Sequence, residues 1–226
     1  MILHWDDATE THCNVPNFFP SVSAAVASFS PEKFIWRLFV GLHGAPRIVT
    51  AIAFRNFLSS SPLRSYPNAR FFHVLCNFAC SLHILEVMFL LLLTCVSSTE
   101  NYEFHKTSFV GFIVCSVIYM FLSTFLFDLS GRRRTSTLGE KSYQYKLLYS
   151  GGQISSLILA MYFFYRHNTY CEPYVYSFFA LSEYSVIIFN ILFHSTAYYD
   201  FYGRRLSLTF GSSEYTPLPM HSEKRI

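Results

Sequence analysis

The chain has 226 residues, of which 52% are hydrophobic and 14% are charged, and its formal net charge is +3. This composition leaves too few polar residues to cover a sizeable water-soluble domain, so one membrane domain is expected. The positive residues gather in short loops and form no basic face, which excludes a protein that binds nucleic acid.

Five apolar segments follow one another along the chain, each about as long as a helix that crosses a bilayer. They cover Phe34–Leu58, Phe71–Val96, Ser108–Leu129, Lys146–Tyr165 and Tyr174–Tyr199. The segments are too long for barrel strands, and a backbone in lipid must satisfy its own hydrogen bonds. The sequence therefore predicts an all-α, polytopic transmembrane helix bundle over residues 34–199. Residues 1–33 precede the bundle, and residues 200–226 are expected to form a flexible tail.

The positions of Lys and Arg predict how the bundle is oriented. Positive side chains concentrate in the first and third connections between spans and in the tail: Arg55, Arg64, Arg70, Arg132, Arg133, Arg134, Lys141, Lys146, Arg204, Arg205, Lys224 and Arg225. Because short loops rich in Lys and Arg stay in the cytosol, these connections and the C-terminus are expected there. The N-terminal segment is then expected in a lumen.

Cysteine positions indicate one candidate disulfide. Cys13 and Cys171 fall on the predicted lumenal side, whereas the other cysteines lie within spans. Only these two can meet in an oxidising compartment, so we predict a bond between the N-terminal segment and the last lumenal loop. Two unpaired thiols remain the alternative, because sequence alone gives no distance.

The first span is unusual because it contains Arg37, His43, Pro46 and Arg47. An ionisable side chain at such depth costs on the order of a few kcal/mol, so it normally faces the bundle interior, a water-filled cavity or an opposite charge. Arg47 therefore needs an acidic partner.

Depth along the helices suggests which side chains meet. Counting about 1.5 Å per residue from the lumenal ends places four ionisable side chains at one level, roughly 15 Å below the surface. They are His43, Arg47, Glu86 and Glu183. This cluster is either a set of ion pairs that fixes helix register or a pocket for a lipid headgroup or another polar ligand. His194 and Asp200 are expected near the cytosolic boundary.

Catalytic and metal-binding motifs are weak. His194 and Asp200 are six residues apart, which misses the spacing of glycerolipid-type acyltransferases, and the chain has no serine nucleophile elbow. No set of His and Cys residues has the spacing of a metal site. The sequence predicts no metal and no cofactor.

Four blocks of the sequence resemble one family. They run from Thr11 to Ser23, from Trp36 to Arg47, from Tyr165 to Glu172 and from Glu183 to Phe201. The blocks resemble the Frag/DRAM/Sfk-type membrane family, in the branch of lipid-anchor remodelling factors that is related to the N-terminal part of yeast Cwh-type proteins. The likeness extends over nearly the whole chain from Thr11 to about Phe201.

The resemblance implies a multi-pass Golgi membrane protein that acts when glycosylphosphatidylinositol (GPI) anchors exchange an unsaturated fatty chain for a saturated one. The step it implies is reacylation of the lyso-anchor with stearate. The implied partners are GPI-anchor lipid, lyso-GPI proteins, membrane lipids and an acyltransferase. The resemblance implies six spans, with one before the block that begins at Thr11, and this sequence is expected to lack that span.

Three hypotheses of function follow. In the first, Arg47 and His43 contact the polar headgroup of a GPI-anchor lipid, and Glu86 and Glu183 hold them in place. This protein would then accompany an acyltransferase, since it has no acyltransferase motif of its own. In the second, the protein is the acyltransferase, with His43 or His194 as general base. A transporter ranks last because the chain has little internal repetition.

Overall fold

The computed structural model describes residues 4–61 and 69–204. Within these ranges the chain is helical and contains no strand. Its helices are α1 (Trp5–Thr9), α2 (Val22–Ala27), α3 (Glu32–Ser59), α4 (Ala69–Cys95), α5 (Tyr102–Leu129), the 3₁₀ helix η2 (Arg132–Thr135), α6 (Thr137–Tyr170), α7 (Val175–Ser195) and α8 (Ala197–Asp200). Most of the tail predicted for residues 200–226 lies outside the described residues.

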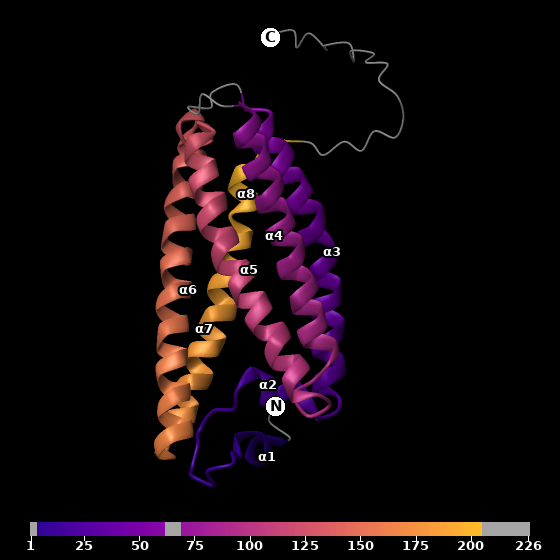
Figure 1. Ribbon diagram of the computed structural model, residues 1–226, viewed down its shortest axis with the longest axis vertical. Coiled ribbons are helices and arrows are strands. Elements are labelled where there is room, and N and C mark those ends of the chain that lie inside the picture. Colours follow the sequence, from indigo (N-terminus) through magenta and orange to yellow (C-terminus); the bar gives the residue numbers. More distant parts are fainter. Residues whose placement is uncertain (1–3, 62–68, 205–226) are drawn as a thin grey trace, which may run out of the picture.

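The five long helices run along one axis and form a bundle (Figure 1). Helix α4 packs between α3 and α5, and α6 packs along α7. We call the end of the bundle that carries α1 and α2 the N-terminal end, and the end that carries η2 and α8 the C-terminal end. The all-helical bundle expected from the sequence is confirmed.

Four of the long helices, α4 to α7, have the length and hydropathy of membrane spans. Helix α3 is equally long, with 28 residues, but lies outside this set, and it carries Arg37, Arg47 and Arg55. Its outward face is nevertheless apolar, with exposed Leu38 and Leu42 among others. The helix therefore has an apolar surface for lipid and a charged residue, Arg47, that is turned inward.

Helix α6 begins earlier than its apolar pattern suggests. The Ser136 side chain caps it by accepting a hydrogen bond from the Gly139 backbone, and the helix continues for 34 residues. Lys146, expected in a cytosolic loop, instead lies inside this helix with 2% of its surface exposed. The prediction failed because an opposite charge on α8 compensates the buried ammonium group.

The main hydrophobic core lies toward the C-terminal end. It is built from aromatic and aliphatic side chains of α3, α4, α5 and α7, including Phe54, Phe72, Tyr119, Phe127 and Phe193. A second, smaller cluster contains Phe112, Ile113 and Val186. The larger group of buried apolar side chains therefore lies where α3, α4 and α5 approach η2.

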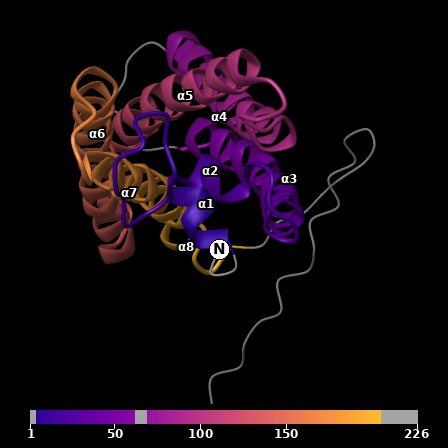
Figure 2. The same ribbon diagram turned by 90° about the horizontal axis from the view of Figure 1, so that it is seen from below.

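The N-terminal segment lies across the N-terminal end of the bundle (Figure 2). The Phe18 and Phe19 backbones donate hydrogen bonds to the Ser177 hydroxyl at 2.8 and 3.1 Å, and the Phe18 ring packs against Tyr174. The segment is thus docked on the beginning of α7 by its aromatic residues.

Candidate functional site

The centre of the site is an ion pair between α3 and α4. Arg47 Nη2 donates to Glu86 Oε1 at 2.7 Å, and the two side chains are 5% and 0% exposed. The pair joins a cation and an anion that are both too costly to bury alone. The prediction that Arg47 has an acidic partner inside the bundle agrees with this geometry.

Two residues of α7 complete the surroundings of Glu86. His194 Nε2 lies 3.1 Å from Glu86 Oε1 and also contacts the Arg47 guanidinium. Asn190 Nδ2 donates to Glu86 Oε1 and to Ser116 Oγ, each at 2.8 Å. Polar groups from α3, α4, α5 and α7 therefore meet around one carboxylate.

The expected position of His194 near the cytosolic boundary is wrong. Residue counting assumed that all helices end at one level, but in Figure 1 the lower ends of α6 and α7 extend below those of α4 and α5. This stagger brings His194 to the level of Glu86. It also places Glu183 closer to the N-terminal end than Arg47.

Several polar atoms around the ion pair have no hydrogen-bond partner among the described residues. They are Arg47 Nε, Glu86 Oε2, both ring nitrogens of His83, and Oε1 of Gln153. The His83 ring instead packs on Tyr119 and His194, at centroid distances of 4.5 and 4.4 Å. Unsatisfied buried polar atoms are rare in folded proteins, so this site has hydrogen-bonding capacity left for a ligand or water.

A cavity of about 360 Å³ opens beside the ion pair. Its walls are mostly apolar and come from α2, α3, α4, α5 and α7; His43, Arg47, Glu183 and Asn190 add polar groups. Three of the four side chains predicted to cluster therefore line one cavity. Glu86 is fully buried and contacts Arg47, whereas Glu183 is not part of the ion pair: its Oε2 accepts a hydrogen bond from the Val22 backbone at 2.9 Å.

A second cavity of about 480 Å³ lies between α5, α6 and α7. Apolar side chains such as Leu157, Met161 and Phe179 form most of its wall. Ser23, His105 and Glu183 are among the residues that line both cavities. We call the 360 Å³ space the first cavity and the 480 Å³ space the second cavity.

Ser23 and His105 meet where the two cavities adjoin. Ser23 Oγ lies 3.1 Å from His105 Nε2, and His105 Nδ1 lies 2.8 Å from the Val96 carbonyl oxygen. Sequence reasoning did not select these residues, because they are 82 positions apart and α2 lies outside the apolar segments. The Ser21 cap of α2 was the one local signal of a helix there.

A second buried ion pair lies near the C-terminal end. Lys146 Nζ donates to Asp200 Oδ2 at 2.7 Å, to Ser142 Oγ at 2.7 Å and to Thr196 Oγ1 at 2.8 Å. All three ammonium protons thus have acceptors. Asp200, which was expected at the membrane boundary, is buried in this pair.

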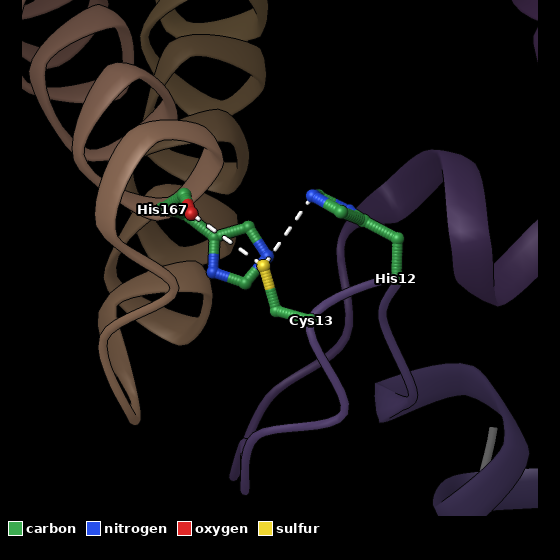
Figure 3. A group of neighbouring side chains, drawn as sticks. All are labelled: His12, Cys13 and His167. Carbon is green, nitrogen blue, oxygen red and sulfur yellow. Dashed lines mark hydrogen bonds between the residues drawn. The ribbon is translucent and has the colours of Figure 1, made fainter.

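The disulfide between Cys13 and Cys171 joins the N-terminal segment to the end of α6, with 5.4 Å between the Cα atoms. His12 and His167 lie beside the Cys13 sulfur, which is 3.3 Å from His12 Nε2 (Figure 3). A disulfide sulfur is not a thiolate, so these three residues do not form a metal-ligand set in this state. In a second group, His83, Glu86 and His194, the Arg47 guanidinium already contacts Glu86 and His194.

These features define a class: a multi-pass helical membrane protein with ion pairs buried in the bundle and apolar cavities near one end. The chain belongs to the Frag1/DRAM/Sfk1/Cwh43P N-terminal domain family, whose model matches residues 1–204. The resemblance found in the sequence blocks is confirmed.

Individual relatives are similar over most of their length. The chain is 54% identical over 226 residues to "Post-GPI attachment to proteins factor 2" of Caenorhabditis briggsae, covering 99% of this chain and 86% of that protein. It is 50% identical to the protein of the same name from Caenorhabditis elegans, with the same coverage. It is 39% identical to "Acyltransferase PGAP2" of Xenopus tropicalis, covering 92% and 81% of the two chains. No solved structure matches the chain.

Proposed function

We propose that this protein binds the lipid part of GPI anchors in the first cavity and takes part in fatty-acid remodelling of the anchor in the Golgi membrane. The observation that carries the proposal is a mostly apolar cavity in which His43 and Arg47 offer hydrogen bonds. The relatives named for post-GPI attachment support the choice of lipid.

The chemistry of the first cavity suits a lipid with an anionic polar part. Arg47 uses one nitrogen for Glu86, and its Nε has no partner. A guanidinium binds phosphate and ester oxygens well because it presents several donors in a fixed plane. His43 is one turn earlier on α3 and is exposed, so it can contact the same polar group.

The test measures binding of lysophosphatidylinositol to the purified full chain in nanodiscs. Arg47→Lys keeps the charge for Glu86 but removes the planar fork, and His43→Gln changes a side chain that has no role in the buried network. Each variant is expected to weaken binding about tenfold, since a hydrogen bond to a charged group contributes about 1.5–3 kcal/mol.

Arg55→Gln provides the matched control. Arg55 is an exposed arginine on the same helix, and it contacts Asn56 and Asn77 away from the first cavity. Binding by this variant should equal that of the unmodified chain. The same variants are then introduced into cells that lack the endogenous protein, where Arg47→Lys and His43→Gln should reduce GPI-anchored proteins at the surface. Unchanged binding and full rescue by both would overturn the proposal and leave Arg47 and Glu86 as a structural pair.

A second candidate function, acyl transfer by this chain itself, is favoured by one observation. A relative that is 39% identical is named an acyltransferase. Of the two histidines expected as bases, His194 is occupied by Arg47 and Glu86, and no residue in the described part of the chain forms a hydrogen bond that orients the His43 ring.

A further inference from the structure

The contact between Ser23 and His105 has the geometry of a nucleophile and its base. A carbonyl oxygen can only accept a hydrogen bond, so the neutral His105 ring carries its proton on Nδ1 and donates it to Val96. Nε2 then has a free lone pair, which lies 3.1 Å from Ser23 Oγ. The serine hydroxyl can therefore donate to a histidine whose orientation is fixed from behind, and the Glu183 side chain is another hydrogen-bond partner of Ser23.

The two residues are also at a suitable depth. Helix α5 has 28 residues and is therefore about 42 Å long, whereas the hydrocarbon core of a bilayer is about 30 Å thick. His105 is the fourth residue of this helix, so it lies close to the boundary between headgroups and acyl chains. The ester bonds of membrane lipids lie at the same boundary.

Ser23 and His105 lie where the two cavities adjoin. These two residues line both cavities, so a group bound in either cavity can reach them. The first cavity has polar groups at His43 and Arg47, whereas most of the wall of the second cavity, including Leu157 and Phe179, is apolar. One space suits the polar part of a lipid, and the other suits a fatty chain.

We infer that Ser23 and His105 are the nucleophile and general base of an acyl transfer, in which the second cavity holds the fatty chain and the first holds the lyso-lipid that receives it. The donor is an acyl ester of a glycerophospholipid or an acyl thioester. This inference rests on the proposed function, since it names the reaction of the same bound lipid.

The first half-reaction acylates the serine. Ser23 Oγ attacks the acyl carbonyl carbon and forms the new C–O bond while its proton moves to His105 Nε2. The bond between that carbon and the leaving oxygen or sulfur then breaks, and His105 returns the proton to the leaving group. The enzyme is left as an acyl-serine with a neutral histidine.

The second half-reaction releases the chain to the acceptor. The free hydroxyl of the lyso-lipid loses its proton to His105 Nε2 and attacks the acyl-serine carbonyl. The bond from that carbon to Ser23 Oγ breaks, and the serine recovers its proton from His105. Atoms and protons balance over the cycle, and no oxidant or metal takes part.

The experiment uses the purified full chain in nanodiscs with lysophosphatidylinositol as acceptor. Stearoyl-coenzyme A and vesicles of distearoylphosphatidylcholine are the two donors, in separate arms. Mass spectrometry looks for a stearoyl group on the peptide that contains Ser23, and lipid analysis measures the diacyl product. We expect acyl-serine and product with one of the donors, and the productive arm identifies the donor class.

Two variants and two controls define the role of each residue. Ser23→Ala should abolish the acyl-serine, and His105→Gln should lower the transfer rate about 100-fold or more. Ser185→Ala removes a hydroxyl that bonds only within α7, and His73→Gln alters a histidine near the start of α4. Both controls should transfer stearate at the unmodified rate.

Binding and transfer are measured on the same preparations, so the two proposals fail separately. If the unmodified chain binds lysophosphatidylinositol but forms neither acyl-serine nor product with either donor, the acyl-transfer inference is overturned and the binding function stands. Product formation by Ser23→Ala at the unmodified rate also overturns it. If Arg47→Lys and His43→Gln bind normally while Ser23 is still acylated, the first cavity is not the lipid site.

Discussion

The two ends of the bundle both contain buried ionisable side chains, but these side chains differ in how completely they are hydrogen-bonded. Near the C-terminal end, Lys146 donates to three acceptors and lies over the rings of Phe54 and Phe127 of the main hydrophobic core. Toward the N-terminal end, Arg47 and Glu86 keep unpartnered atoms and lie beside the first cavity. The first arrangement closes the bundle, whereas the second leaves hydrogen-bonding capacity next to open space.

This difference separates a structural role from a binding role. A fully satisfied buried network rigidifies a core and has no group left for a ligand. A partly satisfied network beside a cavity is destabilising unless something else completes it. Lipid or water that enters the first cavity can supply the missing partners of Arg47.

The largest effect is expected at the C-terminal end, where Lys146 and Asp200 form a buried ion pair. Lys146→Met leaves the Asp200 carboxylate buried without its cation, and the free energy of unfolding should fall by about 3–5 kcal/mol. Thermal unfolding of the full chain in detergent measures the loss. Lys146→Met combined with Asp200→Leu should recover most of it, because replacing both charges by apolar groups is often neutral.

Lipid binding by Lys146→Met provides the control for a structural role of the C-terminal end. Below its unfolding temperature, Lys146→Met should bind lysophosphatidylinositol like the unmodified chain, because Lys146 lines neither cavity. A double variant as unstable as the single one, or weaker binding by a folded Lys146→Met, would contradict a purely structural role for this end.

The positions of some site residues could be predicted from the sequence, and those of others could not. The apolar segments predict the number and order of the long helices. Counting residues along the helices predicts the contact between Arg47 and Glu86, because α3 and α4 are adjacent in both sequence and space. The same count failed for His194 and Glu183, since the stagger of α7 arises from packing that hydropathy does not record. Ser23 and His105 were missed because α2 is a short helix that docks on the bundle only in the folded chain.

Lys146 illustrates a different limit. Its charge predicts the end of a span, because a lysine in lipid is costly without a partner. The partner, Asp200, is 54 residues away and follows the last span. No local pattern connects the two residues, so the length of α6 could not be predicted.

The next largest effect is expected at the N-terminal end when the disulfide is removed. The disulfide joins residues 158 positions apart, so Cys13→Ser with Cys171→Ser should lower the free energy of unfolding by about 2–4 kcal/mol. The segment with α1 and α2 should detach first, since the short helix α2 packs on α3 and α7 through few contacts. Limited proteolysis of residues 10–31 should become fast, and product formation by Ser23 should fall with it.

A cysteine control distinguishes loss of the bond from loss of a side chain. Cys95 is an exposed free cysteine at the end of α4, and Cys95→Ser should leave proteolysis unchanged. Reducing agent should make the unmodified chain as sensitive as the double variant. Equal resistance of the double variant and the unmodified chain would mean that the aromatic contacts alone hold the segment.

A smaller effect is expected where α6 packs on α7, a contact that extends through both regions. A Cβ added at Gly152 would come within 2.6 Å of the Phe189 ring, whereas one added at the adjacent Gly151 meets nothing within 4 Å. Gly152→Ala should cost about 1–3 kcal/mol by overpacking. Gly151→Ala should instead stabilise the helix by up to about 1 kcal/mol. Thermal unfolding of the two variants decides this, and equal midpoints would show that Phe189 moves aside.

The smallest effect is expected in the loop between α4 and α5. The Ser97 backbone N–H and the Arg37 guanidinium hold the pKa of Glu100 below its usual value. A carboxyl whose pKa is lowered on folding stabilises the fold above its unfolded pKa, and this contribution is lost as the pH falls through the folded pKa. The protection factor for hydrogen exchange at Ser97, which corrects for the intrinsic pH dependence of exchange, should therefore fall in the unmodified chain as the pH is lowered from 5 to 3. Glu100→Gln should give a low protection factor at Ser97 at both pH values, with little change in global stability, since exposed ion pairs contribute little. Glu103→Gln, which breaks only the pair with Lys106 within α5, should keep the pH dependence. A high protection factor in Glu100→Gln at pH 5 would show that packing holds the loop and that the Glu100 carboxylate does not.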